Sequence, residues 1–360
     1  MWLEKNEKVL NRRDHSWGGV DINHQILNPS NFEKLPKVEL HVHLEGAIPR
    51  DALWALIHKY HGDSSIPDWD AFIRRFRYKN FSQFIETWVW KNKFIREYED
   101  FTYIANAVAQ DMVRQNIKYA EIFFSPSDFN HREMTPQRIG EAIRKGFDTV
   151  KGIETVLIAD LVRDFGPQNA EKVLNDIKEI KDLGVTGIGI GGSEKKFPPD
   201  LFKEVFEQAR QYGFHTSAHA GEADGPKSIW SALCDLRVDR IGHGVRAIED
   251  KNLVNYLVAN HIPLEICPIS NVKTGVVNSY LDHPVRKYFD HGIFMSINTD
   301  DPTMFGNSLA LEYSKLATFH GFSRYEIKHL ILQGINMAWM PDSEKKRLTA
   351  QFKNSREWLD

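Results

Sequence analysis

The sequence has few of the features that place a protein in a membrane or outside the cell. Its 360 residues include only two cysteines, Cys234 and Cys267, which allow at most one disulfide bond and exclude a cluster of thiolate metal ligands. No apolar run approaches the length that spans a membrane. The first residues lack the apolar segment of a secretory signal. We therefore expect a cytoplasmic protein that does not associate with membranes.

An excess of charge of one sign is also missing. The chain carries 46 Lys and Arg against 49 Asp and Glu, a net charge of −3, so its composition gives no reason to expect nucleic acid or an anionic membrane as a partner. No linker rich in Gly, Ser or Pro, no repeat and no low-complexity tract divides the sequence. We expect one domain over residues 36–360, preceded by a polar N-terminal extension over residues 1–35.

Short apolar runs rich in β-branched residues recur from residue 38 onward, and helical patterns separate them. Eight strands are expected to begin near Val38, Tyr119, Thr155, Val185, His215, Arg240, Pro263 and Phe294. The alternation of strands and helices predicts an α/β fold, a (β/α)8 TIM barrel. A doubly wound open sheet is the alternative.

Several helix boundaries can be read from the sequence. Thr135 and Pro136 pair an N-cap residue with the residue favoured at the first helical position, and Ser323 to Glu326 has the pattern of a capping box. An apolar stripe predicts a helix that ends at Gly184, with its members at Val173, Ile177, Ile180 and Leu183.

The interval between the first two strands is much longer than the others and has room for a helical insertion. Residues 81–101 in this interval are rich in aromatic side chains, most of which we expect in the core. A segment inserted after the first strand of a barrel lies at the catalytic end, so a lid or an apolar subsite is the alternative role.

Polar side chains are concentrated where the expected strands end. In the stretch "KVELHVHLEGA", residues 37–47, His41, His43 and Glu45 would share one face of a strand. Other strand ends supply His219, Glu222, His243, Asp300 and Asp301. In a barrel these ends meet at one rim. Three histidines and a carboxylate at that rim would suit Zn²⁺ with room for a bound water.

Other catalytic motifs fail their context or are missing. "GIGIGG", Gly187 to Gly192, matches a dinucleotide-binding pattern, but "SEKKFPPD" follows where a helix should begin. The sequence contains no HExxH motif and no PCxxC motif, which excludes the zinc-deaminase arrangement that uses thiolate ligands.

Five blocks resemble the signature of a known family. "LPKVELHVHLEGAIP", "HAGEADGPKSIW", "RIGHGV", "EICPISNVKTG" and "SINTDDP" span Leu35 to Pro302 and are similar, in the same order, to blocks of the adenosine deaminase family within the amidohydrolase superfamily. The resemblance implies a (β/α)8 barrel that holds one Zn²⁺ per chain and hydrolyses the 6-amino group of an adenine-type purine.

The resemblance also implies a role for each site residue. The metal ligands would be His41, His43, His219 and Asp300. Glu222 would move a proton at purine N1, and His243 would orient and support the attacking hydroxide. Asp301 would hydrogen-bond purine N7, and the backbone N–H of Gly192 would meet N3. Superfamily members with two metals carry a lysine at the end of strand 4; the expected strand 4 here has none, which favours a single metal.

The motif around Glu45 leaves the substrate open. Nucleoside deaminases of the family usually have HLDG, whereas this sequence has HLEG, and Glu45 would reach toward the substituent on purine N9. "FFSPSDF", residues 123–129, favours a nucleoside. The alternatives are an adenine deaminase and a deaminase of aminodeoxyfutalosine or of an N6-substituted AMP. Rivals of a different class are a non-catalytic purine-binding relative and a two-metal amidohydrolase.

Overall fold

The computed structural model describes residues 30–78 and 81–359. Most of the expected N-terminal extension, residues 1–35, therefore lies outside the described residues. The described chain begins with helix α1 (Ser30–Glu33). No helix in this part of the chain is both long and apolar enough to cross a bilayer. Cys234 is exposed and Cys267 is buried, and neither forms a disulfide bond.

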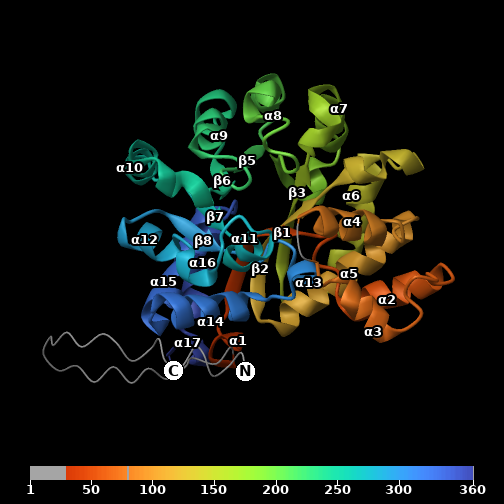
Figure 1. Ribbon diagram of the computed structural model, residues 1–360, viewed down its shortest axis with the longest axis horizontal. Helices are drawn as coiled ribbons and strands as arrows, with labels where there is room; N and C mark the ends of the chain where they lie inside the picture. Colours follow the sequence, from red (N-terminus) through yellow and green to blue (C-terminus); the bar gives the residue numbers. More distant parts are fainter. Residues whose placement is uncertain (1–29, 79–80, 360) are drawn as a thin grey trace, which may run out of the picture.

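Eight parallel strands form one sheet whose spatial order follows the chain (Figure 1). They are β1 (Lys37–His43), β2 (Ile117–Phe124), β3 (Glu154–Asp160), β4 (Val185–Gly189), β5 (His215–Ala220), β6 (Arg240–His243), β7 (Leu264–Ile266) and β8 (Met295–Ile297). The segment after β8 returns to β1, where the Asp300 N–H donates to the His41 carbonyl at 3.0 Å and the His43 N–H donates to the Asp300 carbonyl at 2.9 Å. These bonds close the barrel. The predicted (β/α)8 fold is confirmed, and the open sheet is excluded.

Helices surround the barrel, and the expected helical insertion follows β1 (Figure 1). The insertion comprises α2 (Arg50–Lys59), α3 (Trp69–Arg75), α4 (Phe81–Asn92) and α5 (Tyr98–Arg114). The later helices are α6 (Pro136–Phe147), α7 (Gly166–Lys178), α8 (Lys203–Gln211), α9 (Pro226–Ser231), α10 (Lys251–Ala259), α11 (Pro268–Lys273), α12 (Val285–Asp290), α13 (Pro302–Phe305), α14 (Leu309–His320), α15 (Arg324–Met337), α16 (Asp342–Lys353) and α17 (Arg356–Leu359).

The predicted helix starts are confirmed, but one predicted end is wrong. The Thr135 side chain caps α6, and Ser323 and Glu326 form the capping box of α15. The helix expected to reach Gly184 instead ends at Lys178, and a short 3₁₀ turn follows. After this break Ile180 still packs inward, and its Cδ1 would lie 2.4 Å from a Cβ added at Gly140.

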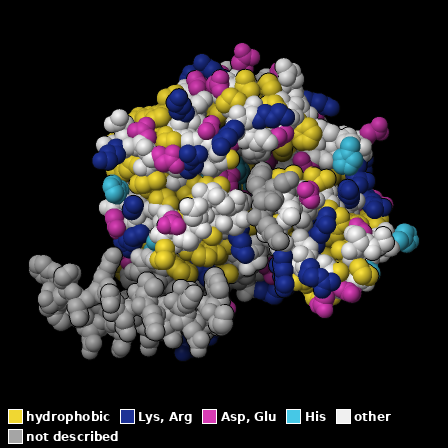
Figure 2. All heavy atoms as spheres, viewed as in Figure 1, with side chains coloured by type: hydrophobic (Ala, Val, Ile, Leu, Met, Phe, Trp, Pro, Cys, Tyr) yellow, Lys and Arg dark blue, Asp and Glu magenta, His cyan; other side chains and the backbone are white. Residues whose placement is uncertain are grey.

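Buried charges occupy the end of the barrel where β6 begins. The Arg240 guanidinium is 1% exposed, lies 2.5 Å from Glu121 and 2.7 Å from Glu265, and stacks 3.6 Å from the Trp339 ring. Gly187 makes room for that ring, because an added Cβ would lie 2.4 Å from it. Outside, positive and negative side chains are interspersed over the face shown in Figure 2.

Candidate active site

A cavity of about 340 Å³ lies at the opposite end of the barrel, where the strands terminate. This volume is within the range of small-molecule pockets. All eight strand ends or the segments after them contribute to its wall, through His43, Ser125, Asp160, Gly191, His219, His243, Thr274 and Asp300. The sequence prediction that polar side chains from different strands meet at one rim is confirmed.

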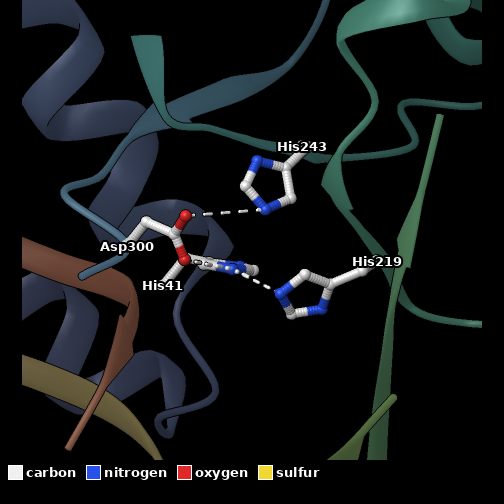
Figure 3. Close-up of side chains that lie close together, drawn as sticks. All are labelled: His41, His219, His243 and Asp300. Atoms are coloured by element: carbon white, nitrogen blue, oxygen red, sulfur yellow. Dashed lines mark hydrogen bonds and ion pairs between the residues drawn. The ribbon is translucent and has the colours of Figure 1, made fainter. Parts of the chain in front are cut away.

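Histidine nitrogens and a carboxylate converge in the depth of this cavity. Nε2 of His219 lies 3.1 Å from Nε2 of His41 and 3.3 Å from Nε2 of His43. Oδ1 of Asp300 lies 3.6 Å from His41 Nε2 and 3.4 Å from His43 Nε2. His243 lies beside His219, and one ligand atom from each of His41, His219, His243 and Asp300 lies within 4.8 Å of the others (Figure 3).

The hydrogen bonds around His41 prepare it to bind a metal. Its Nδ1 lies 2.7 Å from Oε2 of Glu265, and Glu265 is held by Arg240 at 2.7 Å and by the Ser217 hydroxyl at 3.1 Å. Burial raises the pKa of Glu265, but Arg240 and His41 outweigh that effect and lower it overall. Burial lowers the pKa of His41, but Glu265 outweighs it and raises the pKa overall. The carboxylate accepts the Nδ1 proton, so Nε2 is the nitrogen that faces the cluster, where a bound cation would take its lone pair. Carboxylate–histidine–metal arrangements in zinc sites have this geometry.

The protonation of the other groups also suits a cation. Burial lowers the pKa of His43 to about 4 and lowers the pKa of His219 well below its ordinary value, so both rings are neutral at pH 7. Burial raises the pKa of Asp300, but the neighbouring histidines outweigh it and lower the pKa overall. Neutral imidazoles and an ionised carboxylate are the forms that bind zinc. The donor set therefore fits Zn²⁺.

Backbone strain coincides with the cluster. Asp300 has φ of 64° and His243 has φ of 60°, a left-handed conformation that side-chain-bearing residues adopt rarely and at a cost. The Asp300 backbone is held by its bonds to β1, and the Ser270 hydroxyl donates to Oδ2 at 2.6 Å. Such strain occurs frequently at functional sites.

Two further carboxyl groups line the cavity beside the cluster. Burial, followed by the charges of Asp300 and Glu194, raises the pKa of Glu222 to about 8, and its Oε2 lies 3.7 Å from Nε2 of His243. Asp301 is buried, and its Oδ1 has no hydrogen-bond partner among the described residues. Burial and the charge of Asp300 raise the pKa of Asp301 well above its ordinary value, which favours the protonated form that can donate a hydrogen bond.

Glycines keep space around these groups. A Cβ at Gly46 would lie 1.8 Å from Oδ1 of Asp301, so the HLEG motif needs glycine at this position. Gly192 lines the cavity with φ of 101°, and a Cβ there would lie 2.2 Å from Oδ2 of Asp164. Only glycine fits both the conformation and the space.

Glu45 lies beside the cavity rather than in the wall. Its side chain is 1% exposed, and Oε1 accepts a hydrogen bond from the Ser125 backbone N–H at 3.0 Å. Burial raises the pKa of Glu45 to about 7, against the opposing effects of the Ser125 hydrogen bond and of the nearby Lys91. The side chain is therefore positioned to support the Ser125 segment, which itself lines the cavity.

The aromatic segment of the insertion contributes side chains both to the core and to the cavity wall. Trp90 and Phe94 are buried in the core. Phe84 and Trp88 line the cavity from α4, and Phe84 stacks on Phe305 with ring centroids 5.2 Å apart. One side of the cavity is therefore apolar, while the metal side is polar.

Supporting residues around the site were missed in the sequence. Glu194 accepts backbone hydrogen bonds from Gly221 at 2.5 Å, Glu222 at 3.2 Å and Asp224 at 2.8 Å. Arg163 is fully buried and donates to the His219 carbonyl at 2.6 Å. Glu265 supports His41. A charged residue within an apolar strand, such as Glu265 in "PLEIC", is the signal that could have identified such a group.

Comparisons with known proteins agree with this geometry. A family model described as adenosine deaminase matches residues 36–355. An aminodeoxyfutalosine deaminase of Streptomyces coelicolor is 33% identical, with 90% of this chain and 86% of the relative covered. An adenine deaminase of Crocosphaera subtropica is 32% identical, with 89% and 99% covered. A zinc-bound amidohydrolase structure from Burkholderia ambifaria has a TM-score of 0.82 at 26% identity, with 93% of each chain covered. The chain therefore belongs to the adenosine deaminase family of hydrolytic deaminases.

Proposed function

We propose that the protein uses one zinc ion per chain to hydrolyse the 6-amino group of adenosine or of a close adenine nucleoside, giving the 6-oxopurine and ammonia. The observation that carries this proposal is the cavity at the strand ends, which brings a zinc-type donor set together with the carboxyl groups of Glu222 and Asp301.

The proposed zinc ligands are His41, His43, His219 and Asp300. Zinc held by these side chains would lower the pKa of water to about 7 and so make a nucleophile available at neutral pH. Neither β4 nor the segment that follows it, Ile190 to Gly192, contains a lysine, in keeping with a single metal.

The chain's own residues would hold the purine and move its protons. Attack at C6 disrupts the aromatic ring unless N1 is protonated as the new bond forms, and Glu222 would supply that proton and later pass one to the departing ammonia. Asp301 lines the cavity and its buried Oδ1 has no hydrogen-bond partner among the described residues; its carboxyl group would hydrogen-bond N7. The backbone N–H of Gly192 would meet N3, and His243 would donate a hydrogen bond to the attacking oxygen.

The charge of the cavity wall favours an uncharged N9 substituent. Asp128, Asp160 and Asp164 line the cavity beyond the metal group, whereas none of the described residues in the wall is Lys or Arg. A phosphate bound here would meet the carboxyl groups of these aspartates and no Lys or Arg side chain in the described wall, which is unfavourable. Ribose hydroxyls can donate hydrogen bonds to these carboxylates. A nucleoside therefore fits this wall better than an N6-substituted AMP.

A modified adenine nucleoside, such as aminodeoxyfutalosine, is the second candidate. The apolar side of the cavity formed by Phe84, Trp88 and Phe305 could hold an apolar extension of the ribose that adenosine lacks. Free adenine would leave this side without a partner.

A deamination screen of adenine, adenosine, AMP, N6-methyl-AMP and aminodeoxyfutalosine tests the proposal. We expect kcat/KM for adenosine or the modified nucleoside to exceed the values for adenine and for both nucleotides. A preference for a nucleotide would contradict the charge argument, and a preference for adenine would contradict the nucleoside assignment.

The Glu45→Ala variant should lose more kcat/KM with a nucleoside than with adenine, because the Ser125 segment that Glu45 supports lies on the cavity wall.

A further inference from the structure

A chain of three buried side-chain contacts leads away from the cavity behind His243. Nδ1 of His243 lies 3.2 Å from Nδ2 of Asn271, and Oδ1 of Asn271 lies 3.2 Å from Nε2 of His283. Nδ1 of His283 lies 3.2 Å from the backbone nitrogen of Val285. The three side chains are at most 3% exposed as residues, so solvent does not compete for these hydrogen bonds.

The far end of this chain fixes the position of every proton in it. A backbone N–H can only donate, so Val285 requires His283 Nδ1 to be the acceptor. Burial lowers the pKa of His283 to about 3, so its neutral ring carries the proton on Nε2. That N–H needs an acceptor, and the Asn271 amide must therefore present its oxygen to His283. The amide NH₂ then faces His243 Nδ1, which must accept.

His243 and His41 are consequently held in opposite tautomers. With Nδ1 accepting, neutral His243 carries its proton on Nε2, the atom nearest Glu222 at 3.7 Å and Asp300 at 4.0 Å. In His41 the contact with Glu265 at 2.7 Å places a proton on Nδ1, so Nε2 is the nitrogen whose lone pair a metal in the cluster would take. His41 therefore offers a lone pair to a metal, whereas His243 offers an N–H.

We propose that Asn271 and His283 are positioning residues that hold His243 as the Nε2–H tautomer, so that it donates a hydrogen bond to an oxygen in the site and does not bind the metal. The catalytic consequence rests on the proposed function, whereas the tautomer itself does not. By distance alone His243 could be a metal ligand like His41 and His219. The tautomer assigns it a different role, that of a hydrogen-bond donor.

Nitrogen-15 spectroscopy of the zinc-loaded protein with labelled histidine tests the tautomer directly. The resonances of His243 are assigned by their loss in His243→Gln. We expect a protonated Nε2 and an unprotonated Nδ1 in the wild type. In Asn271→Asp the new carboxylate can still accept from His283, but it cannot donate to His243, so Nδ1 of His243 should become protonated.

Kinetics of the same variants test the consequence. Asn271→Asp should lower kcat at least tenfold with zinc content unchanged and KM within about twofold. His283→Leu removes the donor to Asn271 and should lower kcat several-fold, whereas His283→Gln retains an N–H donor and should restore most of the rate. Lys273→Gln, on the exposed side of the same helix, is the matched control and should match the wild type.

The possible failures can be told apart. A wild-type His243 with its proton on Nδ1 overturns the tautomer assignment whatever the substrate is. A reversed tautomer in Asn271→Asp with unchanged kcat overturns the positioning role. If the wild type deaminates no purine, the proposed function fails, while the spectroscopic result still decides the tautomer.

Discussion

Oε2 of Glu222 and Nε2 of His243 lie 3.7 Å apart; Glu222 belongs to the loop after β5, and His243 ends β6. At the scale of single residues the site thus depends on a few side chains whose protons have defined positions. The position of the Asp301 side chain also depends on Gly46, because a methyl group at this residue would occupy the place of the Asp301 carboxyl.

The Glu222→Gln variant tests the proton transfer. Glutamine keeps the shape of the side chain but cannot shuttle a proton, so we expect kcat to fall by roughly two or more powers of ten. Zinc content should equal that of the wild type, because Glu222 is not a proposed ligand. Loss of zinc, or retention of full activity, would show that Glu222 has another role.

The Gly46→Ala variant tests the placement of Asp301. The added Cβ would lie 1.8 Å from Oδ1 of Asp301, so the carboxyl must move away from the substrate and kcat/KM should fall at least tenfold. Gly225→Ala is a suitable control, because its Cβ would meet side-chain atoms no closer than 3.8 Å. Equal kcat/KM values for Gly46→Ala and Gly225→Ala would show that the position of Asp301 does not depend on Gly46.

At the scale of elements, the loops after neighbouring strands hold one another. Glu194, after β4, accepts three backbone N–H groups from the loop after β5, and Glu222 belongs to that loop. The loop that carries Glu222, the proposed proton donor, is therefore positioned by a residue from a different strand-to-helix segment.

Replacing Glu194 should reveal this support. In Glu194→Ala the buried N–H of Gly221 and the partly buried N–H groups of Glu222 and Asp224 lose their acceptor, so we expect kcat to fall by about tenfold or more and the melting temperature to fall by several degrees. Glu194→Gln retains one acceptor oxygen and should fall between the wild type and Glu194→Ala. Activity and thermal unfolding of the three proteins form the measurement; an active, equally stable Glu194→Ala would refute the supporting role.

Elements also show where prediction from the sequence succeeded. All eight strands were located: most are short runs rich in apolar and β-branched residues, and they recur at intervals that suit βα units. The end of α7 was misplaced because the apolar stripe continues through a turn, and Ile180 packs inward without being helical. The support of His41 by Glu265 was not foreseen, because these residues are 224 positions apart and meet only when the barrel closes.

At the scale of the whole molecule, zinc should stabilise the closed barrel. The proposed ligands belong to β1, to β5 and to the segment after β8, so binding favours the folded state over the unfolded chain. Removing the metal with a strong chelator should abolish activity and lower the melting temperature, and one equivalent of Zn²⁺ per chain should restore both. His219→Ala should bind much less zinc. Metal analysis that finds two equivalents in the active protein would contradict the single-metal assignment.

The closure of the barrel between β1 and the Asp300 segment has a consequence for biosynthesis. The Asp300 backbone is hydrogen-bonded to His41 and His43, so the two ends of the proposed ligand set hold each other in the folded protein. While residue 300 is still inside the ribosome, His41 and His43 lack the Asp300 segment to which they hydrogen-bond in the folded protein. The complete four-residue group therefore forms late in synthesis, and truncated products of this chain lack it.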